Sequence, residues 1–154
     1  MDLDETLIHC FERSLSTSDL ELTISIDGYP IDVGINIRPY AITFLKRMKK
    51  RWEIVIFTAS HQSYADAILD ELDPDGGLFD HRLYRQHCRE LTTDFFIKDL
   101  SKINRDPSKM VLVDNSAYSY AMQIDNGIPI FPFYEGKDFE LSALEQYLNR
   151  LSEC

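Results

Sequence analysis

Residues 54–60 of the chain read Ile-Val-Ile-Phe-Thr-Ala-Ser, and this stretch indicates the fold class. Four consecutive apolar residues are typical of a strand that is buried on both faces of a parallel sheet. The run ends abruptly at Thr58, and ligands of open α/β sheets bind beyond the carboxyl ends of the strands. The polar residues after this strand therefore stand where a functional site is expected.

The segments on either side of this strand alternate between helical and extended patterns. Pro39 suits the first turn of a helix, and Ala41–Met48 carries apolar residues at the spacing of one helix face. The same reasoning predicts a helix over Tyr64–Leu72, strands at Arg82–Tyr84, Phe95–Ile97, Met110–Val113 and Ile128–Ile130, and a closing helix over Leu141–Leu151. This alternation predicts a three-layer α/β fold with a mainly parallel sheet.

A small antiparallel insertion is expected ahead of the first helix. Leu20–Ile26 and Tyr29–Ile37 alternate apolar and polar residues, and Asp27-Gly28 between them is a strong hairpin turn signal. The chain shows no repeat, no low-complexity tract and no Ser/Gly/Pro-rich linker. We therefore predict a single domain over residues 1–154, with the β insertion at about 20–37.

The composition narrows the class of protein. Of the 154 residues 44% are hydrophobic, which suffices for one domain with a sizeable core. The net charge of −10 disfavours direct binding to DNA or RNA, where affinity comes from clustered Lys and Arg. No segment approaches the ~20 apolar residues of a membrane helix, so we expect a soluble intracellular protein. Three widely spaced cysteines, Cys10, Cys88 and Cys154, indicate neither a disulfide framework nor a zinc site.

The first residues, Asp2-Leu3-Asp4-Glu5-Thr6, place two carboxylates two positions apart, and in an extended segment both point to the same side. A carboxylate can attack a phosphate monoester to form an acyl phosphate. The second carboxyl group must then protonate the leaving oxygen and later activate water. Asp2 is the expected nucleophile, and Asp4 is the expected general acid and base.

Two negative charges this close require a cation, and carboxylate and carbonyl oxygens are the ligands that Mg²⁺ prefers. Asp114 and Asn115 directly follow another predicted strand, so they can face Asp2 across the cleft. We expect Asp2, the backbone carbonyl of Asp4 and Asn115 to bind Mg²⁺. Lys98 also follows a predicted strand, where it can neutralise a phosphoryl oxygen.

Seven segments together resemble one protein family across essentially the whole chain. They are DLDETLIHC at 2–10, RPY at 38–40, IVIFTAS at 54–60, LYRQHC at 83–88, IKDL at 97–100, VDNS at 113–116 and DNGIPI at 125–130. In this order they resemble the small phosphatases that dephosphorylate the carboxy-terminal repeat domain of RNA polymerase II. These form the FCP/SCP-like, or NLI-interacting-factor-like, branch of the haloacid dehalogenase superfamily. The resemblance implies a Rossmann-like three-layer α/β/α domain in which a short β insertion replaces a large cap.

The resemblance also implies roles for individual residues. Asp2 and Asp4 match the nucleophile and acid/base positions. Three residues match positions that contact the phosphate, namely Thr6, Thr58 and Lys98. Arg85 matches a cleft arginine that helps with substrate, and Asn115 matches a Mg²⁺ ligand. Asp114 matches a position that acts on the metal directly or through a neighbouring group. Asp99 is expected to be structural.

A short insertion in place of a large cap implies an open cleft, which suits a phosphorylated peptide. The resemblance implies a Mg²⁺-dependent protein serine/threonine phosphatase that forms an aspartyl phosphate and acts on phosphoserine in peptides like the RNA polymerase II repeats. It also implies a nuclear location, with the cytoplasm as the alternative. Two interpretations remain open for Phe11, Ile24, Ile26 and Tyr64, which either form an apolar wall for a substrate proline or fill the core of the insertion.

The chain departs from the family pattern at its start and at Ala117. Several apolar residues normally precede the first aspartate of a buried nucleophile strand, but only Met1 precedes Asp2. We therefore expect a truncated first strand, with unpaired backbone groups, a partly open core and a displaced Asp2. The alternative is that another segment or chain fills the gap. Ala117 replaces a proline that often follows the DNS motif, with little expected effect.

Two other classes of function compete with the phosphatase. A catalytically inactive binding module, or an inactive fragment of such a phosphatase, would agree with the short first strand, whereas intact Asp4 and Asn115 favour catalysis. A phospho-accepting receiver domain also combines acidic residues with Thr or Ser and Lys around Mg²⁺. Its acidic pair lies on a different strand from the phosphorylated aspartate, so the adjacent Asp-x-Asp-x-Thr disfavours it. The sequence carries no signal for the oligomeric state.

Overall fold

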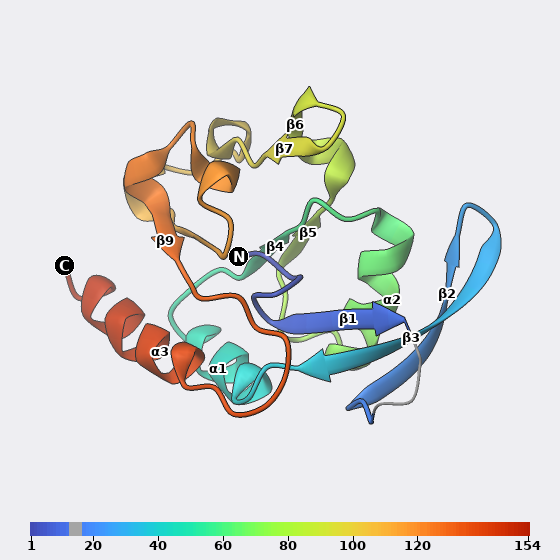
Figure 1. The fold of residues 1–154 in the computed structure, drawn as a ribbon. Helices are drawn as coiled ribbons and strands as arrows, with labels where there is room; N and C mark the ends of the chain where they lie inside the picture. The colour runs from blue at the N-terminus through green and yellow to red at the C-terminus, as the bar shows by residue number, and fades with distance from the viewer. Residues whose placement is uncertain (13–16) are drawn as a thin grey trace.

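The computed structural model describes residues 1–12 and 17–154. Its helices are α1 (Ala41–Met48), α2 (Gln62–Leu72) and α3 (Glu140–Leu151), with 3-10 helices at Arg85–His87, Leu100–Lys102, Pro107–Lys109, Ala117–Tyr120 and Ile124–Asn126 (Figure 1). The strands are β1 (Ile8–Glu12), β2 (Leu20–Ile26), β3 (Tyr29–Ile37), β4 (Val55–Phe57), β5 (His81–Leu83), β6 (Arg89–Thr92), β7 (Phe95–Ile97), β8 (Leu112–Asp114) and β9 (Gly127–Pro129). The helices and strands that were predicted with residue ranges are present, with ends within two residues of those predicted, whereas the residues around Asp2 belong to no assigned strand. Among the described residues, no helix is both long and apolar enough to cross a bilayer.

Two parallel strand pairs form the centre of the α/β unit, and the start of the chain joins them. β4 pairs with β5, and β8 pairs with β9. Between these pairs, Phe57 N donates to the Met1 carbonyl at 2.9 Å, and Asp2 N donates to the Val113 carbonyl at 2.9 Å. Backbone bonds to both neighbours hold Asp2 in line with the strands, so the displacement of Asp2 expected above is wrong.

The core has an opening beside Met1. An apolar cavity of about 400 Å³ lies there between α1, β4, β8 and α3, and its lining includes Phe44, Val55, Leu112 and Leu148. It contains none of the predicted site residues. The functional site and this opening are therefore separate features of the sheet.

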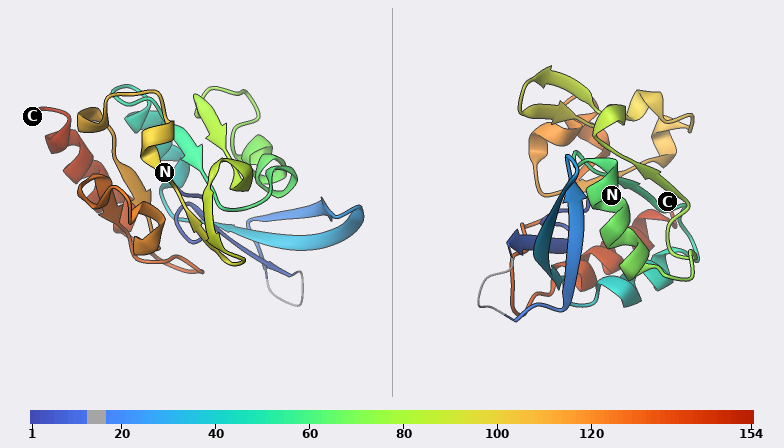
Figure 2. Two further views of the ribbon diagram at one scale, coloured as in Figure 1. Left: turned by 90° about the horizontal axis from the view of Figure 1, so that it is seen from above. Right: turned by 90° about the vertical axis from the view of Figure 1, so that its right-hand side faces the viewer.

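The antiparallel insertion is larger than predicted. The hairpin of β2 and β3 has the expected bounds, and its turn residues Asp27 and Gly28 take positive φ of 51° and 84°, as a two-residue hairpin turn requires. β1 adds a third strand by pairing with β3, from Ile8 opposite Ile37 to Glu12 opposite Val33. Figure 2 shows α2 beside this twisted sheet. The insertion therefore stands next to the helix that follows β4.

The predicted strand Phe95–Ile97 has the expected bounds but a different partner. It pairs antiparallel with β6, which the sequence analysis did not predict, instead of joining the parallel sheet. Every side chain of β6 is exposed, so the apolar pattern that reveals buried strands is missing there. The β6–β7 hairpin stands above the ends of the parallel strands in Figure 1.

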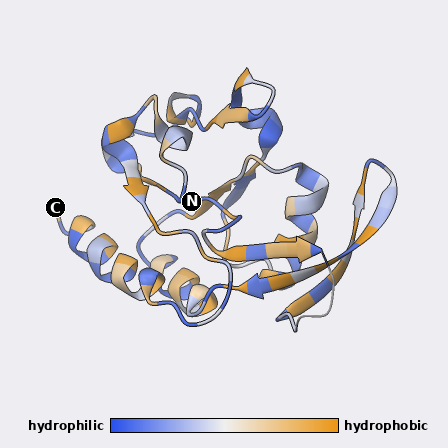
Figure 3. Ribbon diagram, viewed as in Figure 1, coloured by the Kyte–Doolittle hydropathy of each residue, from blue (hydrophilic) through white to orange (hydrophobic). Residues whose placement is uncertain are grey.

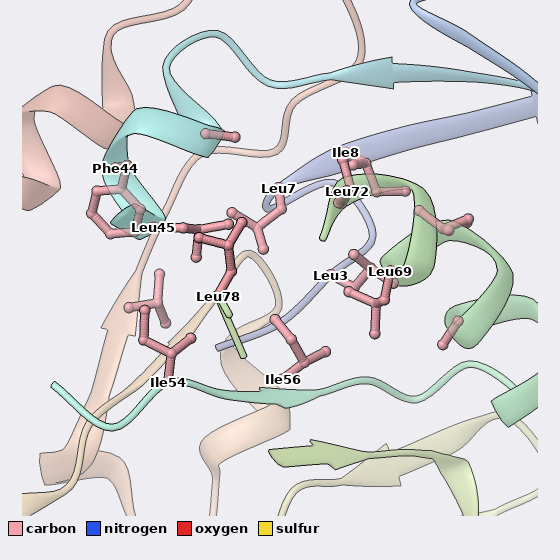
Figure 4. Packing of buried hydrophobic residues seen from close by; sticks show 14 of the residues in the cluster. Leu3, Leu7, Ile8, Phe44, Leu45, Ile54, Ile56, Leu69, Leu72 and Leu78 are labelled. Carbon is pink, nitrogen blue, oxygen red and sulfur yellow. The ribbon is translucent and has the colours of Figure 1, made fainter. Parts of the chain in front are cut away.

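The Asp-x-Asp-x-Thr segment is anchored in the main hydrophobic core. Leu3 and Leu7 are completely buried and pack with Leu45, Ile56 and Leu69 (Figure 4). Along α1 and α3 hydrophobic and hydrophilic residues alternate at helical spacing (Figure 3), and the apolar face is the buried one. Each fully buried leucine contributes roughly 1.5–3 kcal/mol, so Leu3 and Leu7 anchor the turn that carries the two carboxylates.

Candidate functional site

The predicted site residues gather at the carboxyl ends of the parallel strands. A cavity of about 470 Å³ there is lined by a set that includes Asp2, Asp4, Thr58, Arg85, Lys98, Asp114 and Asn115. Thr58 directly follows β4, and Asp114 ends β8. Thr6 completes the group, because its Oγ1 donates to Asp2 Oδ2 at 3.1 Å. The structure thus brings all the predicted site residues into one place.

Lys98 lies between two carboxylates at the base of the cavity. Its Nζ donates to Asp2 Oδ1 and to Asp114 Oδ2, each at 2.6 Å, and its side chain is only 2% exposed. Burial lowers the pKa of Lys98, but the two carboxylates raise it by more, so the pKa lies above its usual range. Burial also raises the pKa of Asp114. One ammonium is therefore shared by two carboxylates, Asp2 and Asp114, and does not balance both of their charges.

Asp4 has a different environment from Asp2. Ser60 Oγ donates to Asp4 Oδ2 at 2.7 Å, and Tyr64 Oη donates to Asp4 Oδ1 at 2.5 Å. Burial raises the pKa of Asp4, while the two hydroxyl donors oppose that rise without cancelling it. Burial and the nearby Asp4 carboxylate also raise the pKa of Tyr64, which stays a donor. Asp4 is therefore more easily protonated than an ordinary aspartate.

A tight turn after Asp4 brings Thr6 back to the nucleophile. Glu5 has a φ of +59°, in the left-handed region, and Leu7 N donates to the Leu3 carbonyl at 2.9 Å. The completely buried Arg38 holds this turn, because its Nη1 donates to the Thr6 carbonyl at 3.1 Å. The backbone reversal and the arginine together fix the Thr6 hydroxyl beside Asp2.

The atoms predicted to bind Mg²⁺ lie next to one another. One terminal atom of the Asn115 amide is 3.1 Å from Asp2 Oδ2 and 3.3 Å from the Asp4 carbonyl oxygen. As a nitrogen this atom would donate to both. As an oxygen it lies 3.3 Å from Thr6 Oγ1, whose one proton is shared between this atom and Asp2 Oδ2, and three oxygens then converge. Neighbouring oxygens around Mg²⁺ with bonds of ~2.1 Å are about 3.0 Å apart, so this donor set fits the ion.

Asp114 uses both of its carboxylate oxygens within the protein. Oδ2 accepts from Lys98 Nζ, and Oδ1 accepts from Ser116 N at 2.8 Å. These bonds favour the second of the two roles considered for Asp114, in which it acts through a neighbouring group. Asp99 accepts from Ser101 N at 3.0 Å and caps the 3-10 helix Leu100–Lys102, in agreement with the structural role expected for it.

Arg85 and Thr58 lie on the wall of the cavity. Arg85 Nε donates to the Ala59 carbonyl at 2.6 Å, and its guanidinium lies 4.8 Å from the ring centroid of Phe96. Thr58 Oγ1 accepts from Ser60 N at 3.0 Å, so this threonine also shapes the turn after β4. Both side chains are held in place by the protein before any substrate contact.

The sequence does not predict the hydrogen bonds that Ser60 and Tyr64 make to Asp4. Tyr64 was considered only as an apolar surface or as core, whereas its hydroxyl bonds Asp4. Ile24 is 1% exposed and belongs to the core, which favours the core interpretation for that residue. The position of Ser60 directly after the strand, in Thr-Ala-Ser, was the one available signal.

Comparison with known proteins agrees with this geometry. A family model described as NLI interacting factor-like phosphatase matches residues 1–154. CTD small phosphatase-like protein 3 of Caenorhabditis elegans is 41% identical over 152 residues, which are 98% of this chain and 53% of that protein. The human Carboxy-terminal domain RNA polymerase II polypeptide A small phosphatase 1 is 37% identical over 153 residues, 99% of this chain and 58% of that protein. The chain thus spans little more than half the length of these two relatives.

The fold is similar to that of a solved structure. Fission yeast RNA polymerase II CTD phosphatase Fcp1, bound to beryllium fluoride, superposes with a TM-score of 0.73 over 99% of this chain and 49% of that one, at 21% sequence identity. At this identity the likeness shows the fold alone. It confirms the α/β fold class expected from the sequence.

Proposed function

Because this chain belongs to the NLI interacting factor-like phosphatase family, we propose that it is a Mg²⁺-dependent protein serine/threonine phosphatase that forms an aspartyl phosphate on Asp2. The observation that carries the proposal is the unequal pair of carboxylates. Asp2 is ion-paired with Lys98, whereas Asp4 is held by two hydroxyls and has a raised pKa. A carboxyl group with a raised pKa, next to one that is paired with an ammonium, suits a general acid beside a nucleophile.

In the first half of the reaction, a carboxylate oxygen of Asp2 forms a bond to the phosphorus of the substrate. The bond from phosphorus to the serine or threonine oxygen breaks, and the Asp4 carboxyl group gives its proton to that oxygen. The Lys98 ammonium pairs with the attacking carboxylate of Asp2 and the Thr6 hydroxyl orients it. Arg85, on the cavity wall, supplies positive charge for the anionic substrate.

In the second half, the Asp4 carboxylate takes a proton from a water molecule. The water oxygen bonds to phosphorus, and the bond from phosphorus to Asp2 breaks, which releases phosphate and restores both carboxyl groups. Mg²⁺ bound by Asp2, the Asp4 carbonyl and Asn115 would supply charge neutralisation and polarise a phosphoryl oxygen. The two carboxylates that share the single Lys98 ammonium, Asp2 and Asp114, give the site a need for that positive charge.

The proposed substrate is a phosphorylated protein, with phosphoserine in peptides like the RNA polymerase II carboxy-terminal domain as the first candidate. The human relative is named as a phosphatase of this carboxy-terminal domain of RNA polymerase II. On the same ground we propose that the protein acts in the nucleus, with the cytoplasm as the alternative.

Hydrolysis of an aryl phosphate at mildly acidic pH, with Mg²⁺ or with EDTA, tests the activity. We expect metal-dependent turnover that falls by at least about 10³-fold in Asp2→Asn and Asp4→Asn, whereas the exposed Asp75→Asn retains it. Reduction of the reacting enzyme with borohydride should convert the acyl phosphate at Asp2 to homoserine, which mass spectrometry detects. Comparable turnover in Asp2→Asn, or homoserine at another aspartate, would remove Asp2 from the role of nucleophile. A folded protein without turnover would favour the binding module.

A further inference from the structure

One rim of the catalytic cavity is aromatic. Phe96 and Tyr118 line the cavity, together with Asp94 from the turn of the β6–β7 hairpin. Phe95 packs edge-on against Tyr118, with ring centroids 5.5 Å apart and planes at 66°. We call Phe95, Phe96 and Tyr118 the aromatic rim. Its residues come from β7 and from the 3-10 helix that begins at Ala117. The β6–β7 hairpin lies in the upper part of Figure 1.

The aromatic rim leaves two large rings open to solvent. Phe95 is 51% exposed and Tyr118 is 48% exposed. A single exposed aromatic residue is ordinary on a protein surface. Here two such rings contact each other, and one of them is part of the cavity wall. The exposed apolar surface is therefore continuous with the surface that would hold the substrate phosphate.

The rim also lies against the arginine on the cavity wall. The Arg85 guanidinium stands 4.8 Å from the Phe96 ring centroid, and both residues line the cavity with Lys98. A phosphoresidue bound at Lys98 and Arg85 would carry its neighbouring residues in the peptide past the exposed rings. Asp94, exposed in the same wall, would repel an acidic neighbour.

We propose that the aromatic rim is a substrate subsite, which takes a large apolar side chain flanking the phosphoserine or phosphothreonine of a peptide. This inference rests on the phosphatase function proposed above and adds sequence selectivity to it. Contact with Phe95 and Tyr118 removes apolar surface of both partners from water, and aromatic faces accept aliphatic and aromatic side chains alike. The subsite selects apolar neighbours and disfavours acidic ones.

Phosphoserine peptides with an alanine background test the subsite, with one leucine placed in turn at each of the three positions on either side. We expect kcat/KM about tenfold higher for the best leucine position than for the all-alanine peptide. That ratio should fall towards one in Tyr118→Ala and in Phe95→Ala. Tyr118→Phe, which keeps the ring, should preserve the ratio, as should Tyr147→Ala on α3, a control with a similar exposure of 53%.

Binding of the same peptides, fluorescently labelled, to the Asp2→Asn variant separates this inference from the phosphatase function. A leucine preference in binding without hydrolysis by the unmodified protein would overturn the phosphatase and leave the rim in place. Hydrolysis and binding with no leucine preference would overturn the rim. A preference that survives Tyr118→Ala and Phe95→Ala would do the same, because another surface would then make the contact.

Discussion

Tyr64 Oη donates to Asp4 Oδ1 at 2.5 Å, which links the first turn of α2 to the proposed general acid and base. Burial raises the pKa of Asp4, and the hydrogen bonds from Tyr64 and Ser60 oppose this rise because they stabilise the carboxylate form. Tyr64 therefore both orients the carboxyl group and limits the pH range over which it stays protonated.

Tyr64→Phe should move the alkaline limb of the kcat/KM profile to higher pH. Without the hydroxyl the carboxylate form of Asp4 is less stable, so its pKa rises further and the proton-donating form persists to higher pH. We also expect kcat to fall about tenfold, because a hydrogen bond to a charged group has been lost. Tyr29→Phe, at a side chain 74% exposed on β3, should change neither quantity. An alkaline limb that stays in place would separate Tyr64 from the protonation of Asp4.

Asn115→Ala should remove most of the stabilisation that Mg²⁺ gives the folded protein. An ion at ~100 times its Kd stabilises the folded state by about 2.7 kcal/mol, and we expect the Kd for Mg²⁺ to rise on the order of 10–100-fold in the variant. Thermal unfolding as a function of Mg²⁺ concentration measures this without any substrate. Asn104→Ala, at an exposed position, should respond to Mg²⁺ like the unmodified protein. An equal Mg²⁺ response in Asn115→Ala would place the ion elsewhere.

Much of the fold could be predicted because its signals are local. The stripe in Ala41–Met48 predicts a helix whose buried residues are Ala41, Phe44, Leu45 and Met48, as observed. Asp27-Gly28 sets both the turn and the register of the hairpin. β6 has no such signal, since its side chains are all exposed and its pairing with β7 depends on the turn between them. The sequence therefore predicts the elements better than their partners.

In the candidate site, too, the residues with a local sequence signal could be predicted, whereas the contacts between distant residues could not. Thr58 and Asp114 stand at the ends of apolar runs, so the rule that parallel strands present their carboxyl ends together was enough to group them. Asp2 has no apolar run before it and was predicted from the Asp-x-Asp-x-Thr motif and the family resemblance. The contact of Tyr64 with Asp4 joins residues 60 positions apart through a partly buried hydrogen bond. It depends on how α2 docks and on the turn at Glu5, neither of which is encoded in local spacing.

Asp138→Asn should destabilise the fold through Arg38. This arginine is completely buried and makes two hydrogen bonds to Asp138, at 2.8 and 2.9 Å, besides its bond to the Thr6 carbonyl. Removing the charge of Asp138 leaves a buried guanidinium without its ionic partner, and we expect a loss of about 3 kcal/mol in the free energy of unfolding. Urea denaturation measures this value, and Asp75→Asn is the exposed control.

The pH dependence of that loss gives a second check. Burial raises the pKa of Asp138, but the bonds from Arg38 and Glu140 N lower it by more, so the pKa in the folded state lies below its usual value. A depressed pKa contributes stability above the unfolded value of ~3.9, and the contribution disappears as the pH falls through the folded value. The difference between the unmodified protein and Asp138→Asn should thus be constant near neutral pH and shrink below about pH 4. A constant difference down to pH 2 would exclude the ion pair as its source.

Gly127→Ala should disturb both stability and catalysis through Tyr120. A Cβ at Gly127 would lie 2.1 Å from the Tyr120 ring, so the ring or the backbone must move. The neighbouring Ser119 carbonyl accepts from Lys98 N at 2.8 Å, and any shift of this 3-10 helix therefore reaches the lysine between Asp2 and Asp114. We expect a loss of about 1–3 kcal/mol in the free energy of unfolding and a fall in kcat. Gly77→Ala, with no atom within 4 Å of the added Cβ, should stay within about 0.5 kcal/mol. A Gly127→Ala protein with unchanged stability and reduced kcat would show that the strain is absorbed at Lys98, whereas no change in either would mean that Tyr120 has room to turn aside.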